Sequence, residues 1–330
     1  MNTSTDRKLI LHIGAHKTGS SAIQDFLKRH QSDLKNEGWI FGIRPEQPAN
    51  WGDLVEVRPV PGGADFRLRP GVFKTLLGRI DGGFRHVIVS SEDLFFLEKT
   101  DIDGVAREMQ SRFSDITVIT YVRRQDLMAQ SHWAQGAKTI QSALVFADID
   151  HPLPKISAHV RKYLDYAARL ELWQAALPAA KMIVRVYDRE LFPNRDVVAD
   201  FIATTGLNLK SDDSNSDVNA AFGATTVRFI YMLRAAGVGQ PQIRSMLRDR
   251  RLQVTEDKLL PTRAEAQAYV AEFAASNRRL GAMMGQDQPF STDFSRYAET
   301  VSSAPVDPEY VRSSLLTLLV DAIEKLPPDA

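Results

Sequence analysis

Four short apolar segments, each a continuous run and not an alternation, most constrain the fold of this 330-residue chain. Such runs are typical of strands buried on both faces of a parallel sheet. Segments with helical periodicity separate them, which predicts right-handed βαβ units and a three-layer α/β/α fold around a central parallel sheet. The predicted strands are Lys8–Ile13, His86–Ser90, Ile116–Val122 and Met182–Tyr187, and the predicted helices are Ser20–Asn36, Asp103–Arg112, Leu127–Lys138 and His159–Ala176.

The composition of the chain changes after Gly206, where the alternation of strands and helices ends. Residues 210–219 are rich in Ser, Asp and Asn, which is typical of a polar linker. We therefore predict an α/β core over residues 1–210 and a helical C-terminal subdomain over residues 211–330. The helices predicted for this subdomain are Thr225–Ala236, Pro241–Arg250, Arg263–Met284 and Pro308–Leu326.

The segment from residue 42 to residue 71 is rich in Pro, Gly and Arg and has no clear period. We predict a long loop insertion without secondary structure. Loops of this length are uncommon and often functional, so a lid or a substrate loop is one interpretation. A mobile surface insertion is the other.

The composition excludes several classes of function. The chain has 41 basic and 41 acidic residues, and this balance argues against duplex nucleic-acid binding, which needs a basic surface. The absence of cysteine excludes disulfides, cysteine-ligated zinc and a thiol nucleophile. The spacing of the seven histidines predicts no metal site. The sequence contains neither a run of about 20 apolar residues nor a signal-peptide pattern, so we expect a cytoplasmic protein without an integral membrane segment.

A glycine-containing segment, Gly14–Ser21, follows the first predicted strand and precedes a predicted helix. Glycines let successive backbone N–H groups converge on an anion, and the start of a helix also favours negative charge. Lys17 adds a full positive charge, while Ser20 and Ser21 open the helix. The segment therefore predicts a phosphate-binding loop at the carboxyl edge of the sheet.

The spacing of this loop departs from that of nucleotide hydrolases. Gly14 and Gly19 match G-x-x-x-x-G, but Ser20 stands where the hydrolases have lysine, and Lys17 lies two residues before the second glycine. The hydroxyl that normally binds magnesium directly after that lysine is therefore missing from its usual setting. A loop with its lysine displaced in this way need not be built for a magnesium triphosphate.

A second candidate anion site follows the third predicted strand, which ends in Arg123 and Arg124. Ser131 lies eight positions after Arg123, about two turns into the next predicted helix. A guanidinium fork and a hydroxyl donor suit a phosphate monoester. The eight-residue offset favours Arg123 over Arg124.

Together these motifs resemble the PAPS-dependent sulfotransferases, where PAPS is 3′-phosphoadenosine 5′-phosphosulfate. Lys17-Thr18-Gly19-Ser20-Ser21 matches at every position the family loop K-[TS]-G-[TS]-[TS], which holds the 5′-phosphosulfate. Residues 121–126 followed by Ser131 resemble the motif that reads the 3′-phosphate. The order of motifs over residues 164–207 is similar to that of the bacterial carbohydrate-type branch. The resemblance implies a P-loop fold of the sulfotransferase type.

The resemblance also implies a reaction. The sulfuryl group would pass in line to a hydroxyl or amine of a carbohydrate or small metabolite, leaving adenosine 3′,5′-bisphosphate, with no metal required. The helical subdomain would then lie on the acceptor side. Lys17 would neutralise charge on the leaving phosphate, and a base is needed for the acceptor proton. We favour Glu92, which follows the second predicted strand, over His16 and His132.

Two alternatives remain open at the level of sequence. The first is a P-loop kinase or NTPase that uses ATP and magnesium, with Glu92 or Asp93 as the carboxylate on the magnesium side. The second is a non-catalytic nucleotide-binding protein of the same fold. The sequence identifies neither the acceptor nor the oligomeric state.

Overall fold

The computed structural model describes residues 6–42, 54–60, 63–72, 74, 86–136, 151–211, 222–246, 259–300, 309, 312–313 and 316. The chain forms two compact units that alternate along the sequence. The first unit consists of Met1–Arg124, Arg161–Ser216 and Phe273–Ser291, and the second of Gln125–Val160, Asp217–Glu272 and Thr292–Ala330. These boundaries differ from the expected division at residue 210, because each unit contains segments from before and from after that residue.

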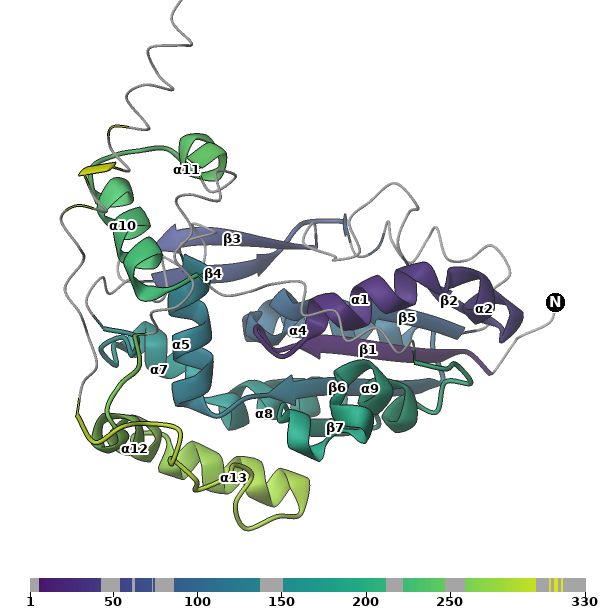
Figure 1. Ribbon diagram of the computed structural model, residues 1–330. Helices are drawn as coiled ribbons and strands as arrows, with labels where there is room; N and C mark the ends of the chain where they lie inside the picture. Colours follow the sequence, from purple (N-terminus) through teal and green to yellow (C-terminus); the bar gives the residue numbers. More distant parts are fainter. Residues whose placement is uncertain are drawn as a thin grey trace, which may run out of the picture. The chain divides into compact units, whose positions relative to one another are not determined.

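The first unit contains a five-stranded parallel sheet in the order β2-β5-β1-β6-β7 (Figure 1). β1 is the central strand, and Lys8 is paired with His86 of β5 on one side and with Asp115 of β6 on the other. The predicted α/β class and parallel sheet are therefore confirmed. The strands are β1 (Lys8–Gly14), β2 (Trp39–Phe41), β5 (His86–Ser90), β6 (Asp115–Val122) and β7 (Lys181–Val186).

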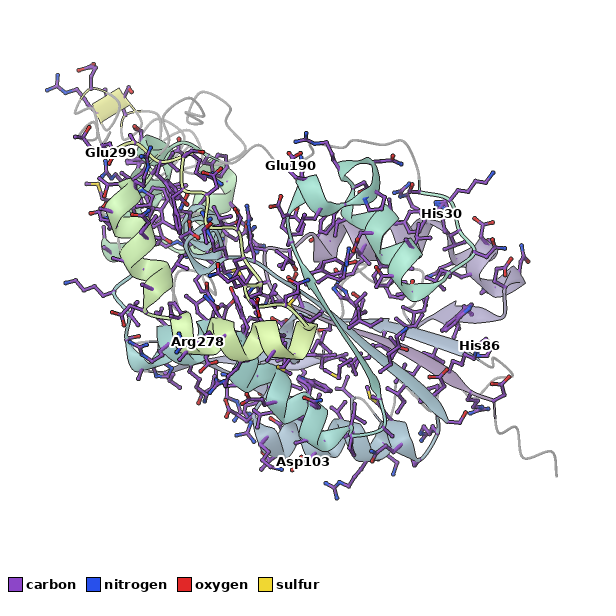
Figure 2. The ribbon with its side chains drawn as sticks, turned by 90° about the horizontal axis from the view of Figure 1, so that it is seen from below. His30, His86, Asp103, Glu190, Arg278 and Glu299 are labelled. Atoms are coloured by element: carbon purple, nitrogen blue, oxygen red, sulfur yellow. The ribbon has the colours of Figure 1, made fainter. Side chains whose placement is uncertain are left out.

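Helices cover both faces of this sheet. α1 packs with α9, whereas α4 packs with α8, which in turn packs with α13. Figure 2 shows the two layers, with His30 at the end of α1 on one side of the strands and Asp103 of α4 on the other. The helices are α1 (Ser20–Arg29), α2 (Gln31–Asn36), α4 (Lys99–Gln110), α7 (Ala158–Leu164), α8 (Tyr166–Ala176), α9 (Val197–Thr205) and α13 (Ala274–Met284). Short 3₁₀ turns are η1 (Glu92–Phe96), η2 (Arg189–Leu191) and η3 (Pro193–Arg195).

Three long helices predicted from the sequence are each broken into two. The helix predicted over residues 20–36 is interrupted at His30, and the one over residues 263–284 between Ala271 and Ala274. The helix over residues 159–176 is interrupted at Asp165, whose carboxylate accepts a hydrogen bond from Ala168 N at 3.1 Å and caps α8. A carboxylate that bonds the backbone two or three residues ahead favours a helix start over a helix interior.

Part of the segment from residue 42 to residue 71 is a β-hairpin, in which β3 (Val55–Val60) pairs with β4 (Gly63–Leu68) in antiparallel fashion. The prediction of a segment without secondary structure is wrong for these residues. The hairpin packs on the unit through three buried side chains, those of Leu54, Val55 and Phe66. The Pro- and Gly-rich composition of the segment conceals these apolar positions in the sequence. Residues 43–53 and 61–62 lie outside the described residues.

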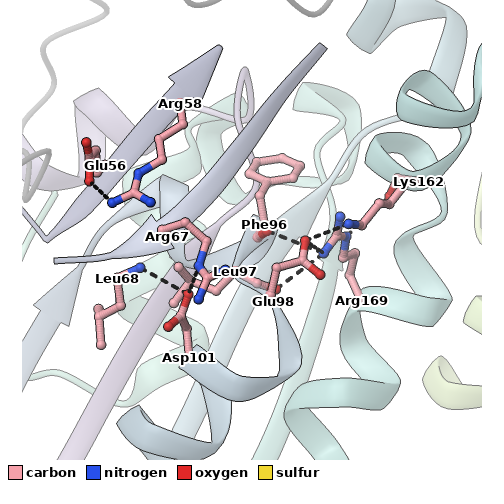
Figure 3. A network of polar contacts seen from close by, with 10 residues as sticks. All are labelled: Glu56, Arg58, Arg67, Leu68, Phe96, Leu97, Glu98, Asp101, Lys162 and Arg169. Carbon is pink, nitrogen blue, oxygen red and sulfur yellow. Dashed lines mark hydrogen bonds and ion pairs between the residues drawn. The ribbon is translucent and has the colours of Figure 1, made fainter. Parts of the chain in front are cut away.

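A network of polar contacts joins the hairpin, the start of α4 and the α7–α8 pair (Figure 3). Asp101 accepts hydrogen bonds from Arg67 Nε at 2.8 Å and from Leu68 N at 3.2 Å. Glu98 pairs with Lys162 at 2.7 Å. The buried Arg169 guanidinium donates to the carbonyl oxygens of Phe96 and Leu97, each at 3.3 Å. The network therefore fixes the end of η1, the turn that follows β5.

The second unit has its own apolar core around Trp133 of α5 (Gln125–Gly136) and Tyr231 of α10 (Ala224–Ala235). The Tyr231 hydroxyl donates to the Trp133 carbonyl at 3.2 Å. α11 (Gln240–Met246) and α12 (Arg263–Ala271) also belong to this unit. The end of the helix predicted over residues 241–250, and most of that over residues 308–326, lie outside the described residues.

In the ranges that the structure describes, no helix is long and apolar enough to span a bilayer.

A buried polar cluster connects α9 to the sheet. Asp200 of α9 is 1% exposed, and it accepts hydrogen bonds from the Tyr121 hydroxyl at 2.8 Å and from Arg185 Nε at 3.0 Å. Arg185 also pairs with the second oxygen of Asp200. This carboxylate therefore joins a helix to two neighbouring strands, β6 and β7.

We expect the substitution Asp200→Ala to lower the free energy of unfolding by about 2 to 3 kcal/mol, because it leaves a buried hydroxyl and a guanidinium without their acceptor. Urea unfolding measures this loss. Glu190→Ala is the control, since Glu190 forms an exposed ion pair with Arg195, and it should change stability by less than about 0.5 kcal/mol. Similar losses for both variants would contradict a structural role for the buried cluster.

Candidate functional site

The loop between β1 and α1 lies at the carboxyl edge of the parallel sheet. β1 continues to Gly14, and β5 and β6 flank it and end at Ser90 and Val122. After β1 the chain passes to β2 on one side of the sheet, whereas after the neighbouring strand β6 it passes to β7 on the other side. Ligands of open α/β sheets bind at this kind of switch point.

The loop has a compact backbone with two left-handed residues, Lys17 at φ 59° and Gly19 at φ 84°. The carbonyl oxygen of Ala15 accepts hydrogen bonds from the Thr18 hydroxyl at 2.6 Å and from the Ser20 hydroxyl at 3.3 Å. Thr18 and Ser20 are buried and shape the loop, whereas Ser21 is exposed. Of the predicted cofactor-binding hydroxyls, Ser21 is therefore the most accessible.

Gly19 is packed against the segment after β7. A Cβ atom at this position would lie 2.8 Å from Val197 Cγ1 and 3.1 Å from Tyr187 Cε2. Together with its positive φ, this close approach explains the glycine at the start of α1. Gly19 thus contributes space and backbone geometry.

Glu92 lies directly against the first residue of the loop. A Cβ atom on Gly14 would lie 2.7 Å from the carbonyl oxygen of Glu92 and 2.9 Å from its Cα. The Ser91 N–H donates to the His12 carbonyl at 3.0 Å and aligns the start of η1 with β1. The absence of a side chain at residue 14 therefore brings Glu92 to the loop.

The Glu92 carboxyl group has a perturbed proton affinity. Burial raises its pKa, and the neighbouring Asp93 charge raises it further, whereas His16, Lys17 and a hydrogen bond with the Ser20 side chain lower it. Desolvation is the largest of these effects, so the pKa is above its ordinary value. His16 and Lys17 are therefore close enough to Glu92 to act on its charge, and the catalytic roles of the three residues stay predictions.

His16 is held at both ring nitrogens. Nε2 lies 2.7 Å from Asp93 Oδ1, and Nδ1 is hydrogen-bonded to the Tyr163 hydroxyl. The ring also packs against Phe96 with 4.5 Å between centroids. Tyr163 lies 147 residues away in sequence, so no local signal could have identified it.

Arg123 and Arg124 have different surroundings. Arg123 Nη1 donates to the Lys17 carbonyl at 3.4 Å, and its guanidinium lies 5.4 Å from the Tyr187 ring centroid. Arg124 is 5% exposed, and its Nη1 donates to the Ser291 carbonyl at 2.8 Å. Arg123 therefore contacts the loop at the Lys17 carbonyl, and Arg124 contacts the segment at Ser291.

Ser131 and His132 lie on α5, in the second unit. Ser131 is half-buried and His132 is buried. The convergence of Arg123 and Ser131 on one anion stays a prediction, and so does the role of His132 as a base. Among the described residues, no group of three or more His, Asp or Glu side chains is arranged to hold a metal ion.

Comparison with known proteins finds similarities both in sequence and in structure. A 124-residue stretch is 34% identical to an uncharacterized protein of Archaeoglobus fulgidus, covering 37% of this chain and 31% of that relative. A sulfotransferase from Alicyclobacillus acidocaldarius is similar in structure over 85% of this chain and 97% of its own, with a TM-score of 0.39 and 15% identity. No protein-family model matches the chain. These similarities do not establish a family.

We expect Gly14→Ala to destabilise the chain by at least about 2 kcal/mol, because the new methyl group meets the Glu92 backbone at a positive φ. Urea unfolding gives this difference. Gly104→Ala is the matched control, since no atom lies within 4 Å of a Cβ at this site in α4. It should be neutral or stabilise by about 0.5 to 1 kcal/mol. A tolerated Gly14→Ala would contradict the close approach.

A second prediction concerns pH. Because the pKa of Glu92 is raised above the ordinary value of 4.5, the folded chain retains a proton that the unfolded chain releases. The stability of the native chain should therefore fall, relative to Glu92→Gln, as pH rises from the ordinary value through the folded value. Urea unfolding of both proteins between about pH 4 and pH 8 measures the difference. A difference that does not change with pH would contradict the raised pKa.

Proposed function

We propose that this chain is a PAPS-dependent sulfotransferase that transfers a sulfuryl group to a hydroxyl or amine of a carbohydrate or small metabolite. The observation that carries this proposal is the position of the Lys17–Ser21 motif. It lies at the switch point of the parallel sheet, with the Arg123 guanidinium bonded to the Lys17 carbonyl. Two cationic residues and a helix start therefore lie at one edge of the sheet, in a chain whose formal net charge is zero.

The donor set fits an anionic nucleotide. Lys17 supplies a charge for the 5′-phosphosulfate, and the backbone N–H groups of residues 17–21 supply donors that need no reorganisation. Thr18, Gly19 and Ser20 hold the loop in shape, and Ser21 adds an accessible hydroxyl. We assign the 3′-phosphate to Arg123 together with Ser131. When bound, PAPS supplies the sulfuryl group and leaves as adenosine 3′,5′-bisphosphate.

We assign Glu92 as the base that takes the proton from the acceptor. It adjoins the loop at Gly14, and burial raises its pKa toward the working pH, which favours general base catalysis. His16 is the alternative, but accepting a proton from an acceptor requires it to give up a hydrogen bond to Asp93 or Tyr163. The transfer itself then depends on positioning and charge, as in phosphoryl transfer.

The first experiment separates this function from an ATP-dependent one. Adenosine 3′,5′-bisphosphate without magnesium should raise the thermal unfolding temperature, because Lys17 and Arg123 bind its phosphates. Stabilisation by ATP with magnesium, but not by the bisphosphate, would overturn the proposal in favour of a kinase or NTPase. Binding of the bisphosphate without transfer of labelled sulfate to any acceptor in a saccharide and metabolite screen would indicate a non-catalytic binding protein.

Arg123→Ala should weaken the binding of adenosine 3′,5′-bisphosphate about 10- to 100-fold, as expected when a charged hydrogen-bond donor is lost. Affinity for adenosine 5′-monophosphate, which lacks the 3′-phosphate, should change less than about threefold. Isothermal titration calorimetry measures both ligands. Equal losses would contradict the assignment of Arg123 to the 3′-phosphate.

Lys17→Ala and Glu92→Gln should each lower turnover of labelled PAPS by about 100-fold or more, because charge neutralisation and proton removal act in the transfer step. His16→Phe tests His16 as the alternative base, since it removes both ring nitrogens while Glu92 remains, and kcat at saturating PAPS should be retained. Full activity of Glu92→Gln would exclude Glu92 as the base.

A further inference from the structure

Lys17 has a backbone conformation that a lysine rarely adopts. Its φ of 59° lies in the left-handed region, where a Cβ atom crowds the neighbouring carbonyl group. Such a residue persists only where the surrounding structure over-determines it. The residues on either side of Lys17 are therefore the places to look for what holds it.

The residue before Lys17 is tied to two separate elements of the first unit. His16 Nε2 is bonded to Asp93 of η1 at 2.7 Å, and His16 Nδ1 is bonded to Tyr163 of α7. His16 and Asp93 retain only 15% and 19% of their side-chain exposure. We call these three residues, Asp93, His16 and Tyr163, the His16 clamp.

The hydrogen bonds of the clamp have a consistent direction. Burial raises the pKa of Tyr163 well above its usual value, so its hydroxyl keeps its proton and donates to Nδ1. Nε2 then carries the ring proton and donates to the Asp93 carboxylate. Both ring nitrogens of His16 are therefore hydrogen-bonded within the clamp.

Aromatic packing removes the remaining freedom of the ring. The Phe96 ring lies 4.5 Å from the His16 ring and is stacked on Tyr163 at 4.1 Å with 13° between planes. Phe66 of the β3–β4 hairpin adds a third ring at 5.8 Å from His16. The polar network of Figure 3 anchors the same elements, since Arg169 binds the Phe96 carbonyl and Asp101 binds β4.

The other side of Lys17 is also held. Its carbonyl oxygen accepts from Arg123 Nη1 at 3.4 Å, and the next residue, Thr18, bonds back to the Ala15 carbonyl at 2.6 Å. The contact on the carbonyl side is long and part of the proposed ligand site. Thr18 therefore also helps to hold the loop, and the clamp holds the residue on the N-terminal side of Lys17.

We infer that Asp93 and Tyr163 are positioning residues, which hold His16 so that Lys17 stays in its left-handed conformation and the anion loop is preformed before a ligand binds. His16 thus acts on binding through the backbone of Lys17 and not as the acceptor base. The identity of the anion rests on the proposed function, whereas the clamp itself concerns the ligand-free chain.

The first test uses hydrogen–deuterium exchange of the ligand-free chain. Tyr163→Phe and Asp93→Ala should each speed exchange of the amides in residues 16–21 at least about fivefold, because the loop opens more often. Asp93→Asn keeps an acceptor oxygen and should remain within about twofold of the native rate. Tyr231→Phe, which loses a buried tyrosine hydrogen bond in the second unit, is the control. Unchanged exchange in both clamp variants would overturn the inference.

The second test separates the hold on Lys17 from general packing. Lys17→Ala and Lys17→Gly both lose the ammonium group, but only glycine adopts a positive φ without cost. With the clamp intact, Lys17→Gly should have the higher urea midpoint, because the clamp forces the strained conformation on alanine. Adding Tyr163→Phe to each variant should reduce this advantage by at least half. An advantage of unchanged size would show that the clamp does not act on Lys17.

The third test connects the clamp to binding. The apparent dissociation constant rises as the fraction of the protein with a preformed loop falls. Tyr163→Phe should therefore weaken the binding of adenosine 3′,5′-bisphosphate at least about fivefold. In turnover of labelled PAPS, KM should rise by a similar factor while kcat stays within about threefold. A loss of kcat at constant KM would contradict a positioning role. If the native chain binds no nucleotide, the proposed function fails, and the exchange and midpoint experiments still decide the clamp.

Discussion

The close approach of the Glu92 backbone to Gly14 is the contact on which the candidate site depends. With 2.7 Å between the Glu92 carbonyl oxygen and the position of a Cβ atom, only glycine allows η1 to lie directly on the end of β1. This contact brings Glu92 to the loop, and the next residue, Asp93, reaches His16. One missing side chain thus places a carboxyl group with a raised pKa next to Lys17.

The positive charge that matters for the candidate site is concentrated at a few residues and is not a property of the whole chain. Basic and acidic residues balance at 41 each, yet Lys17 and Arg123 meet at the carboxyl edge of the sheet. The loop combines the positive charge of Lys17 with its backbone N–H groups. It is held by η1 through Asp93 and by the end of β6 through Arg123. Tyr187 lies beneath Arg123 and also borders Gly19, so one ring supports both the guanidinium and the start of α1. This arrangement is the basis for the proposal that the edge binds a small anion.

Four of the five strands of the parallel sheet were predictable because each is a local apolar run. β1 and β5 are buried along almost their whole length, whereas β7 is only partly buried, and the short strand β2 was missed. The helix interruptions were harder to predict. Asp165 lies within a segment of helical periodicity, so the sequence pattern predicts a continuous helix there. In the structure its carboxylate caps α8 and also binds Ser276 and Arg279 of α13, which are 111 and 114 residues away in the sequence. The β3–β4 hairpin was missed because its stability comes from burial of Phe66 and from the Asp101 contacts to β4, neither of which appears in its own composition.

The sequence by itself determined the parallel sheet, the loop from Gly14 to Ser21 and the candidate residues around it, because each is encoded by neighbouring residues and their spacing. Only the tertiary structure decided that Arg123 contacts the loop while Arg124 is directed to Ser291, and that Tyr163 holds His16. The physical reason is distance along the chain. Hydrogen bonds between residues 106 and 147 positions apart depend on how separate strands and helices pack, and no local pattern records that packing.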